Sequence, residues 1–81
     1  MTAKIDCKVT EGLMPNEKVA RIETADGKSE EVAVSAQNIR DNKLMASVIG
    51  RSEEGNVLVE LPRESASGRW RVWVKAAAIG G

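Results

Sequence analysis

The stretch at residues 71–79, Arg-Val-Trp-Val-Lys-Ala-Ala-Ala-Ile, indicates how the rest of the chain folds. In its first five residues Val72 and Val74 alternate with Arg71, Trp73 and Lys75. An alternation with period 2 is typical of a β-strand with one buried face. Three alanines follow, and a short run of small residues suits a single turn of 3₁₀ helix. The stretch therefore predicts a strand that ends in one helical turn.

The same pattern occurs at residues 31–39, Glu-Val-Ala-Val-Ser-Ala-Gln-Asn-Ile, about forty places earlier. Other short runs rich in Val and Ile also alternate with period 2, and Gly, Pro, Asn and Asp turn signals separate them. Six strands are predicted in all, roughly at residues 5–9, 18–23, 31–35, 44–48, 57–61 and 70–75. We expect an all-β fold.

The two halves of the chain match each other when one is shifted along the other. A shift of 39 places sets Ile5 on Leu44, and a shift of 40 sets Val32 on Val72 and Ile39 on Ile79. Shared spacing of this kind predicts two tandem pseudo-repeats of about 39 residues, 1–40 and 41–81. Because any two all-β stretches share a period, coincidence is the alternative explanation.

Two such units are expected to close on each other, because a three-stranded unit alone leaves unpaired edges. Closure predicts a small closed or partly open barrel of about six strands, in one domain spanning residues 1–81. The predicted core is Ile5, Cys7, Val9, Ala20, Ile22, Val32, Val34, Leu44, Ala46, Val48, Val57, Val59, Leu61, Trp70, Val72 and Val74.

Residues 57–61 with 71–79, and their counterparts 18–22 with 31–39, resemble the closing portion of SH3-like small β-barrels. In that fold a hairpin is followed by a short 3₁₀ turn and a last apolar residue. The resemblance implies a fold and no ligand, because such barrels bind peptides, bind nucleic acids or serve as enzyme subunits. The aromatic groove of the peptide-binding members needs Tyr, which this chain lacks. A pseudo-symmetric six-stranded barrel of another topology also fits.

The composition argues against the common catalytic and metal sites. Twelve basic and twelve acidic residues leave no net charge, and there is no His and only one Cys. Nucleophilic sites that need imidazole are therefore excluded, as are thiolate metal cages. Cys7 is expected to be a small buried side chain, and Glu30-Glu31 and Glu53-Glu54 to be solvated charge. We expect no enzyme activity, no cofactor and no metal.

The location in the cell follows from what the sequence lacks. No apolar run is long enough for a membrane span, and the first residues do not resemble a secretory leader. We therefore expect a cytoplasmic protein that does not associate with a membrane.

One group of residues stands out as a candidate binding surface: Arg69, Arg71, Trp73 and Lys75. If Val72 and Val74 face the core, these four lie on the other face of the strand. The counterpart positions hold Ser29, Glu31, Ala33 and Ser35.

Cations around an outward indole suit a protein contact, which predicts a non-catalytic interaction module or accessory subunit, as a monomer or a homodimer. Weak binding of single-stranded nucleic acid by the same face is the alternative function. In the simplest alternative, Trp73 only covers a neighbouring strand.

Two further apolar features need a place in this scheme. Trp70 falls on the inward phase and is expected to plug one end of the barrel. Leu13 and Met14, in an otherwise polar turn, are expected to cap the open end, or else to project toward a partner.

Overall fold

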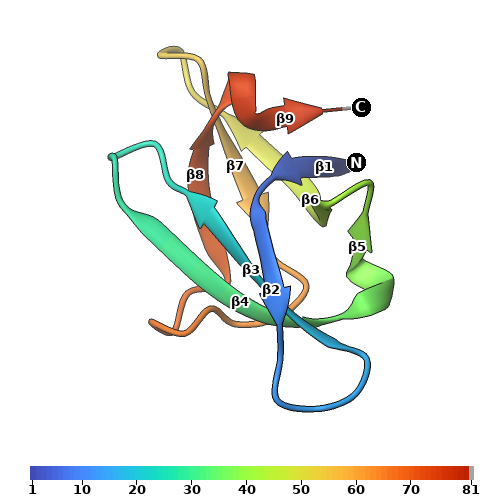
Figure 1. Cartoon of the computed structure of the whole chain (residues 1–81). Coiled ribbons are helices and arrows are strands. Elements are labelled where there is room, and N and C mark those ends of the chain that lie inside the picture. Colours follow the sequence, from blue (N-terminus) through green and yellow to red (C-terminus); the bar gives the residue numbers. More distant parts are fainter. Residues whose placement is uncertain (81) are drawn as a thin grey trace.

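The computed structural model describes residues 1–80 and contains two antiparallel sheets (Figure 1). The larger sheet has the order β8-β7-β6-β1-β9, with β5 also paired to β6, and the smaller has the order β2-β3-β4. The strands are β1 (Thr2–Asp6), β2 (Lys8–Glu11), β3 (Glu17–Glu23), β4 (Ser29–Ser35), β5 (Ile39–Arg40), β6 (Lys43–Arg51), β7 (Asn56–Glu60), β8 (Arg71–Lys75) and β9 (Ile79–Gly80). The expected all-β class is confirmed.

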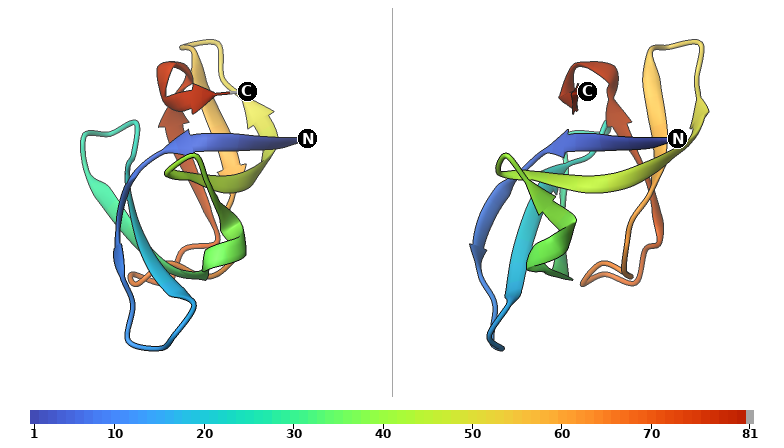
Figure 2. Two further views of the ribbon diagram at one scale, coloured as in Figure 1. Left: turned by 45° about the vertical axis from the view of Figure 1, so that its right-hand side comes forward. Right: turned by 90° about the vertical axis from the view of Figure 1, so that its right-hand side faces the viewer.

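The chain passes from one sheet to the other at Cys7. β1 pairs with β6 in the larger sheet, and after Cys7 the chain continues as β2, which pairs with β3 in the smaller one. The predicted strand at residues 5–9 is thus two strands with a bend between them, visible in Figure 2. Within β1 and β6, Ile5 lies directly opposite Leu44. Both are fully buried, so this pair stands at the centre of the fold.

The two short helical turns occur where the small residues predict them. They are η1 (Ala36–Asn38) and η2 (Ala76–Ala78). Each leads into a two-residue strand that the sequence pattern did not indicate. In β5, Ile39 pairs with Leu44, and in β9, Ile79 pairs with Ile5.

The sheets are not closed into a barrel. The edge strands β4 and β8 form no ladder with each other in the described part of the chain. Instead, Ala25 donates its N–H to the carbonyl of Trp73 at 2.8 Å, and Ala66 donates to the carbonyl of Glu31 at 2.8 Å. Each edge strand thus accepts one hydrogen bond from the turn of the opposite hairpin. Closure of a barrel would need a continuous ladder of hydrogen bonds between β4 and β8 instead.

The core consists almost entirely of side chains on the inward phase. The buried apolar residues are Ala3, Ile5, Ala20, Ile22, Val32, Val34, Leu44, Ala46, Val57, Val59, Leu61, Val72 and Val74. Of the other predicted core residues, Cys7, Val9 and Val48 are only half-buried. Ala3 was not predicted because β1 begins earlier than its Val- and Ile-rich part indicates.

The prediction that Trp70 plugs the barrel is wrong, because 53% of its surface is exposed. Trp70 precedes β8, and its carbonyl accepts a hydrogen bond from the Leu61 N–H, just beyond the end of β7. Leu61 is itself buried there, and the indole lies outside it.

The prediction that Leu13 and Met14 cap the core is also wrong, since they are 98% and 66% exposed. Their turn is closed by its own hydrogen bonds. Gly12 donates its N–H to the Glu17 carbonyl at 2.9 Å, and Leu13 donates to Glu17 Oε1 at 2.9 Å. The β2–β3 hairpin therefore extends past the core, at the bottom of Figure 1.

Candidate interaction surface

The outer face of β8 presents the residues that the sequence singled out. Val72 and Val74 are buried, whereas Arg71, Trp73 and Lys75 are exposed on the opposite face. Arg69 is also exposed and lies two residues before the strand. Because β8 is an edge strand of its sheet, this row lies at the margin of the molecule.

Trp73 is neither fully free nor fully covered. It lies directly opposite Leu58 on β7, and Leu58 in turn lies opposite Gly50 on β6. Cross-strand neighbours bring their Cβ atoms to about 5 Å, so the indole is expected to rest partly on Leu58. The remaining 41% of Trp73 is exposed. Trp73 is thus partly covered and still offers an apolar surface to a ligand.

Two of the three cations around Trp73 already have anionic partners. Arg71 Nε lies 3.1 Å from Glu60 Oε2, and Arg69 Nε lies 3.8 Å from Glu30 Oε2. Lys75 forms no ion pair within residues 1–80. The face therefore carries a mixed charge and not a cluster of free cations.

Glu30 is the functional-site residue that the sequence interpretation missed. Its side chain is only 13% exposed, where solvated charge was predicted. The Ser67 hydroxyl donates to Glu30 Oε1 at 2.6 Å, and this hydrogen bond is the main reason that the pKa of Glu30 is lowered, with Ser65 and Arg69 contributing. The signal was available, since Glu30 shares the inward phase of Val32 and Val34.

A groove of about 520 Å³ runs between the β3–β4 turn, the β6–β7 turn and β8. Trp73, Arg71 and Arg69 line its β8 side. Asp26 and Glu54, which belong to the two turns, also line the groove. The Thr24 hydroxyl donates a hydrogen bond to Asp26, and this bond is the main reason that the pKa of Asp26 is lowered. The candidate residues, apart from Lys75, therefore open onto one concave surface with charges of both signs.

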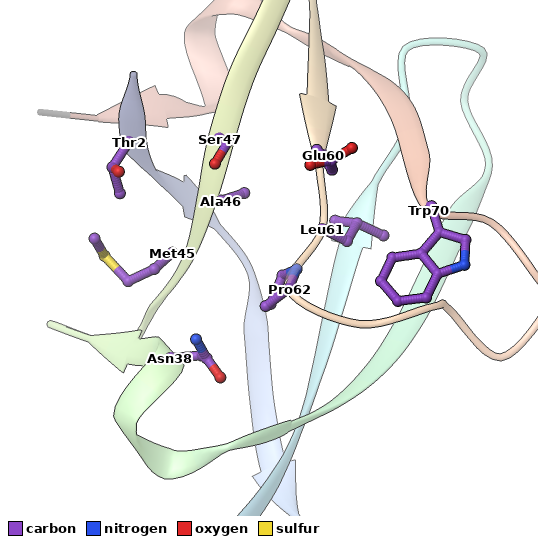
Figure 3. Close-up of a pocket in the computed structure, with 9 residues that line it drawn as sticks. All are labelled: Thr2, Asn38, Met45, Ala46, Ser47, Glu60, Leu61, Pro62 and Trp70. Carbon is purple, nitrogen blue, oxygen red and sulfur yellow. The ribbon is translucent and has the colours of Figure 1, made fainter.

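Trp70 lies in a different groove, of about 540 Å³. Its indole stands beside Leu61 and Pro62 at one end, and Met45 and Asn38 lie at the other (Figure 3). The two tryptophans, which are three residues apart in sequence, thus belong to separate surfaces.

The acidic side chains and the single thiol of the described residues are not gathered into a cluster. Across residues 1–80, no three His, Cys, Asp or Glu side chains gather to hold a metal ion. Cys7 donates its thiol to the Asn42 carbonyl at 3.5 Å, and partial burial raises the pKa of this thiol. A raised pKa leaves less of the reactive thiolate. None of the helices found in residues 1–80 has the length and apolar character to cross a membrane.

Comparison with models of known protein families, with curated proteins and with solved structures finds no match. The resemblance to SH3-like small barrels thus gains no support from a related protein.

Proposed function

We propose that the chain is a non-catalytic interaction module that binds a protein partner through the outer face of β8. The observation that carries the proposal is Trp73, an indole that is 41% exposed and lines a groove with Arg69 and Arg71. Exposed Trp and Arg side chains are the residues that most often dominate protein–protein interfaces. A cytoplasmic location and a monomeric or homodimeric state stay predictions.

The charges on this face favour a protein partner over the alternative, single-stranded nucleic acid. Nucleic-acid binding draws on cations that are free to neutralise phosphates. Here Arg69 and Arg71 form ion pairs with Glu30 and Glu60, and of the cations on this face only Lys75 has no ion pair within residues 1–80. A mixed-charge surface around an apolar centre resembles the rim and core of a protein interface.

For the architecture, we propose a partly open SH3-like barrel that arose by duplication of one unit. Hydrogen bonds recur at matching places in the two halves. Ala36 donates its N–H to the Asn16 carbonyl, and Ala76, forty places later, donates to the Gly55 carbonyl. The two cross-sheet bonds are similar but not equivalent: Ala25 and Ala66 each donate from a hairpin turn, whereas the acceptors, Trp73 on β8 and Glu31 on β4, are two residues out of register. The bonds of Ala36 and Ala76 support an approximate two-fold relation between residues 1–40 and 41–80.

The test is affinity capture from a native cell extract with the wild-type chain, Trp73→Ala and Trp70→Ala. Trp73→Ala should lose the captured protein, because loss of a central Trp weakens an interface by roughly 2 kcal/mol or more, about thirtyfold. Trp70→Ala is the matched control, since it removes an exposed indole from a different groove. Far-UV circular dichroism checks that all three proteins fold. Capture by Trp73→Ala at the wild-type level would refute the proposal.

The nucleic-acid alternative is tested with Trp70→Phe, in which Trp73 is the only indole. Its fluorescence should be unchanged on adding a single-stranded oligonucleotide at low salt. Strong quenching that disappears as salt is raised would favour the alternative function instead.

A further inference from the structure

A third groove, of about 920 Å³, adjoins the groove of Trp73, with which it shares Thr24 and Lys28, but Trp73 itself does not line it. It is bounded by β2 and β3 on one side and by the end of β8 and η2 on the other. Four cations line it: Lys8, Arg21, Lys28 and Lys75. Ala77, Ala78 and Cys7 supply small side chains between them.

These four cations form no ion pair within residues 1–80. The ion pairs found there engage Lys4, Lys18, Lys43, Arg69 and Arg71. Two acidic side chains also line the groove, Asp6 and Glu23, and Asp6 is already bound by Lys43 at 3.1 Å. The groove therefore carries an excess of positive charge in a chain whose net charge is zero.

Two of the cations repel each other directly. Lys8 on β2 lies opposite Arg21 on β3, on the outer face of the smaller sheet. Like charges at directly opposed positions destabilise a hairpin. Arg21 has Glu31 as its other cross-strand neighbour, but the two side chains form no ion pair. Neither Lys8 nor Arg21 therefore has an ion pair within residues 1–80 that would offset their like charges.

The fold itself does not require this arrangement. In the β6–β7 hairpin, the positions 39 places later hold Ser47 and Glu60, which also lie opposite each other. A neutral and an acidic residue occupy that site without conflict. The like-charge pair is therefore a property of this sequence and calls for a functional explanation.

We propose that this groove binds an acidic polypeptide segment in an extended conformation. Opposite charge selects the ligand, and the small side chains of Ala77 and Ala78 leave room for its main chain. A polypeptide fits better than single-stranded nucleic acid, because no aromatic side chain lines the groove to stack on bases. The site goes beyond the function proposed for β8: it shares Lys75 with that face, and Thr24 and Lys28 with the groove beside Trp73.

The probe is fluorescein-labelled octaglutamate, followed by fluorescence anisotropy at low salt. The wild-type chain should bind it with an affinity that falls as salt is raised. Arg21→Glu should weaken binding about tenfold, because it removes one attraction and adds one repulsion. Arg63→Glu makes the same change of charge on an exposed residue outside the groove, and it should leave binding unchanged. Trp73→Ala should also bind normally, which separates this site from the β8 face.

Three results would overturn the proposal: no binding at low salt, an equal loss in Arg21→Glu and Arg63→Glu, or tighter binding of octathymidylate that Arg21→Glu abolishes. The last would identify the groove as a nucleic-acid site. None of them bears on whether Trp73→Ala loses its captured partner, so the two proposals fail separately.

Discussion

At the scale of single residues, Glu30 and Trp70 occupy environments opposite to those that their side chains suggest. Glu30 is a carboxylate on the inward phase of β4, its side chain is only 13% exposed, and Ser67 donates a hydrogen bond to it. Trp70 is apolar and lies exposed at the rim. Both residues involve the loop between β7 and β8. At the ends of the strands, the contacts of this loop and not the alternating pattern therefore decide which side chains are buried and which are exposed.

The prediction at this scale concerns the pH dependence of stability. The pKa of Glu30 lies below its ordinary value of 4.5, chiefly because Ser67 donates to its carboxylate. The unfolded chain therefore takes up this proton at a higher pH than the folded chain does. The resulting stabilisation is present above about pH 4.5 and is lost as the pH falls through the lowered folded pKa.

Glu30→Gln should lower the free energy of unfolding by about 1 kcal/mol at pH 7, because it removes charge-assisted hydrogen bonds. The difference between the two proteins should shrink below about pH 4.5. Urea unfolding at pH 7 and at pH 3 measures both values. Asp41 also has a lowered pKa, but it is present in both proteins; Asp26, whose pKa is lowered too, acts on Glu30 through its charge and makes a smaller contribution to the difference. A difference that stays constant with pH would contradict this account.

At the scale of elements, the β2–β3 hairpin contains one favourable and one unfavourable charge pair. Glu11 lies opposite Lys18, and Lys18 Nζ is 2.7 Å from Glu11 Oε2. Three residues along β2, Lys8 lies opposite Arg21. The two pairs lie on opposite faces of the hairpin, because three residues separate Lys8 from Glu11 along β2.

Lys8→Glu should therefore raise the free energy of unfolding by about 0.5 kcal/mol, because it turns the unfavourable pair into an attractive one. It should also weaken octaglutamate binding. Lys18→Glu makes the same change of charge on the other face of the hairpin, and it should lower the stability because it removes the ion pair with Glu11 and sets two carboxylates opposite each other. Denaturant midpoints of the three proteins provide the measurement. A less stable Lys8→Glu protein would show that Lys8 and Arg21 do not repel each other in the fold.

At the scale of the whole molecule, both sheets share one core, although no ladder joins β4 to β8 in residues 1–80. The chain runs from β1 into β2 and so connects the sheets, and Ile5 lies opposite Leu44 where β1 pairs with β6. A domain of about 80 residues has a modest margin of stability. The loss of one central side chain should therefore be felt throughout the fold.

Leu44→Ala should lower the free energy of unfolding by about 3 kcal/mol, because it leaves a cavity in a fully buried site. Leu13→Ala is the same chemical change in the β2–β3 turn, where Leu13 is 98% exposed, and it should stay within about 0.5 kcal/mol of the wild type. Chemical denaturation of the two variants tests this. A large effect of Leu13→Ala would mean that the turn does pack against the core.

The features that follow from the sequence alone are local ones. Period-2 alternation predicts the hairpin strands and the inward side chains of β3, β4, β7 and β8. It also predicts that Arg71, Trp73 and Lys75 point outward. The small residues that follow β4 and β8 predict the positions of η1 and η2. These predictions succeed because neighbouring residues in an extended chain point to opposite faces whatever the rest of the molecule does.

Tertiary structure alone decided what distant segments do to one another. Four features depend on where one hairpin ends relative to the other. They are the open edges of β4 and β8, the exposure of Leu13 and Trp70, the ion pair between Arg69 and Glu30, and the presence of Lys75, Lys8 and Arg21 in one groove. Such positions are set by packing across the shared core and by a few long-range hydrogen bonds. An alternating pattern contains no information on either, because it records the face that a side chain takes and not the segment that it meets.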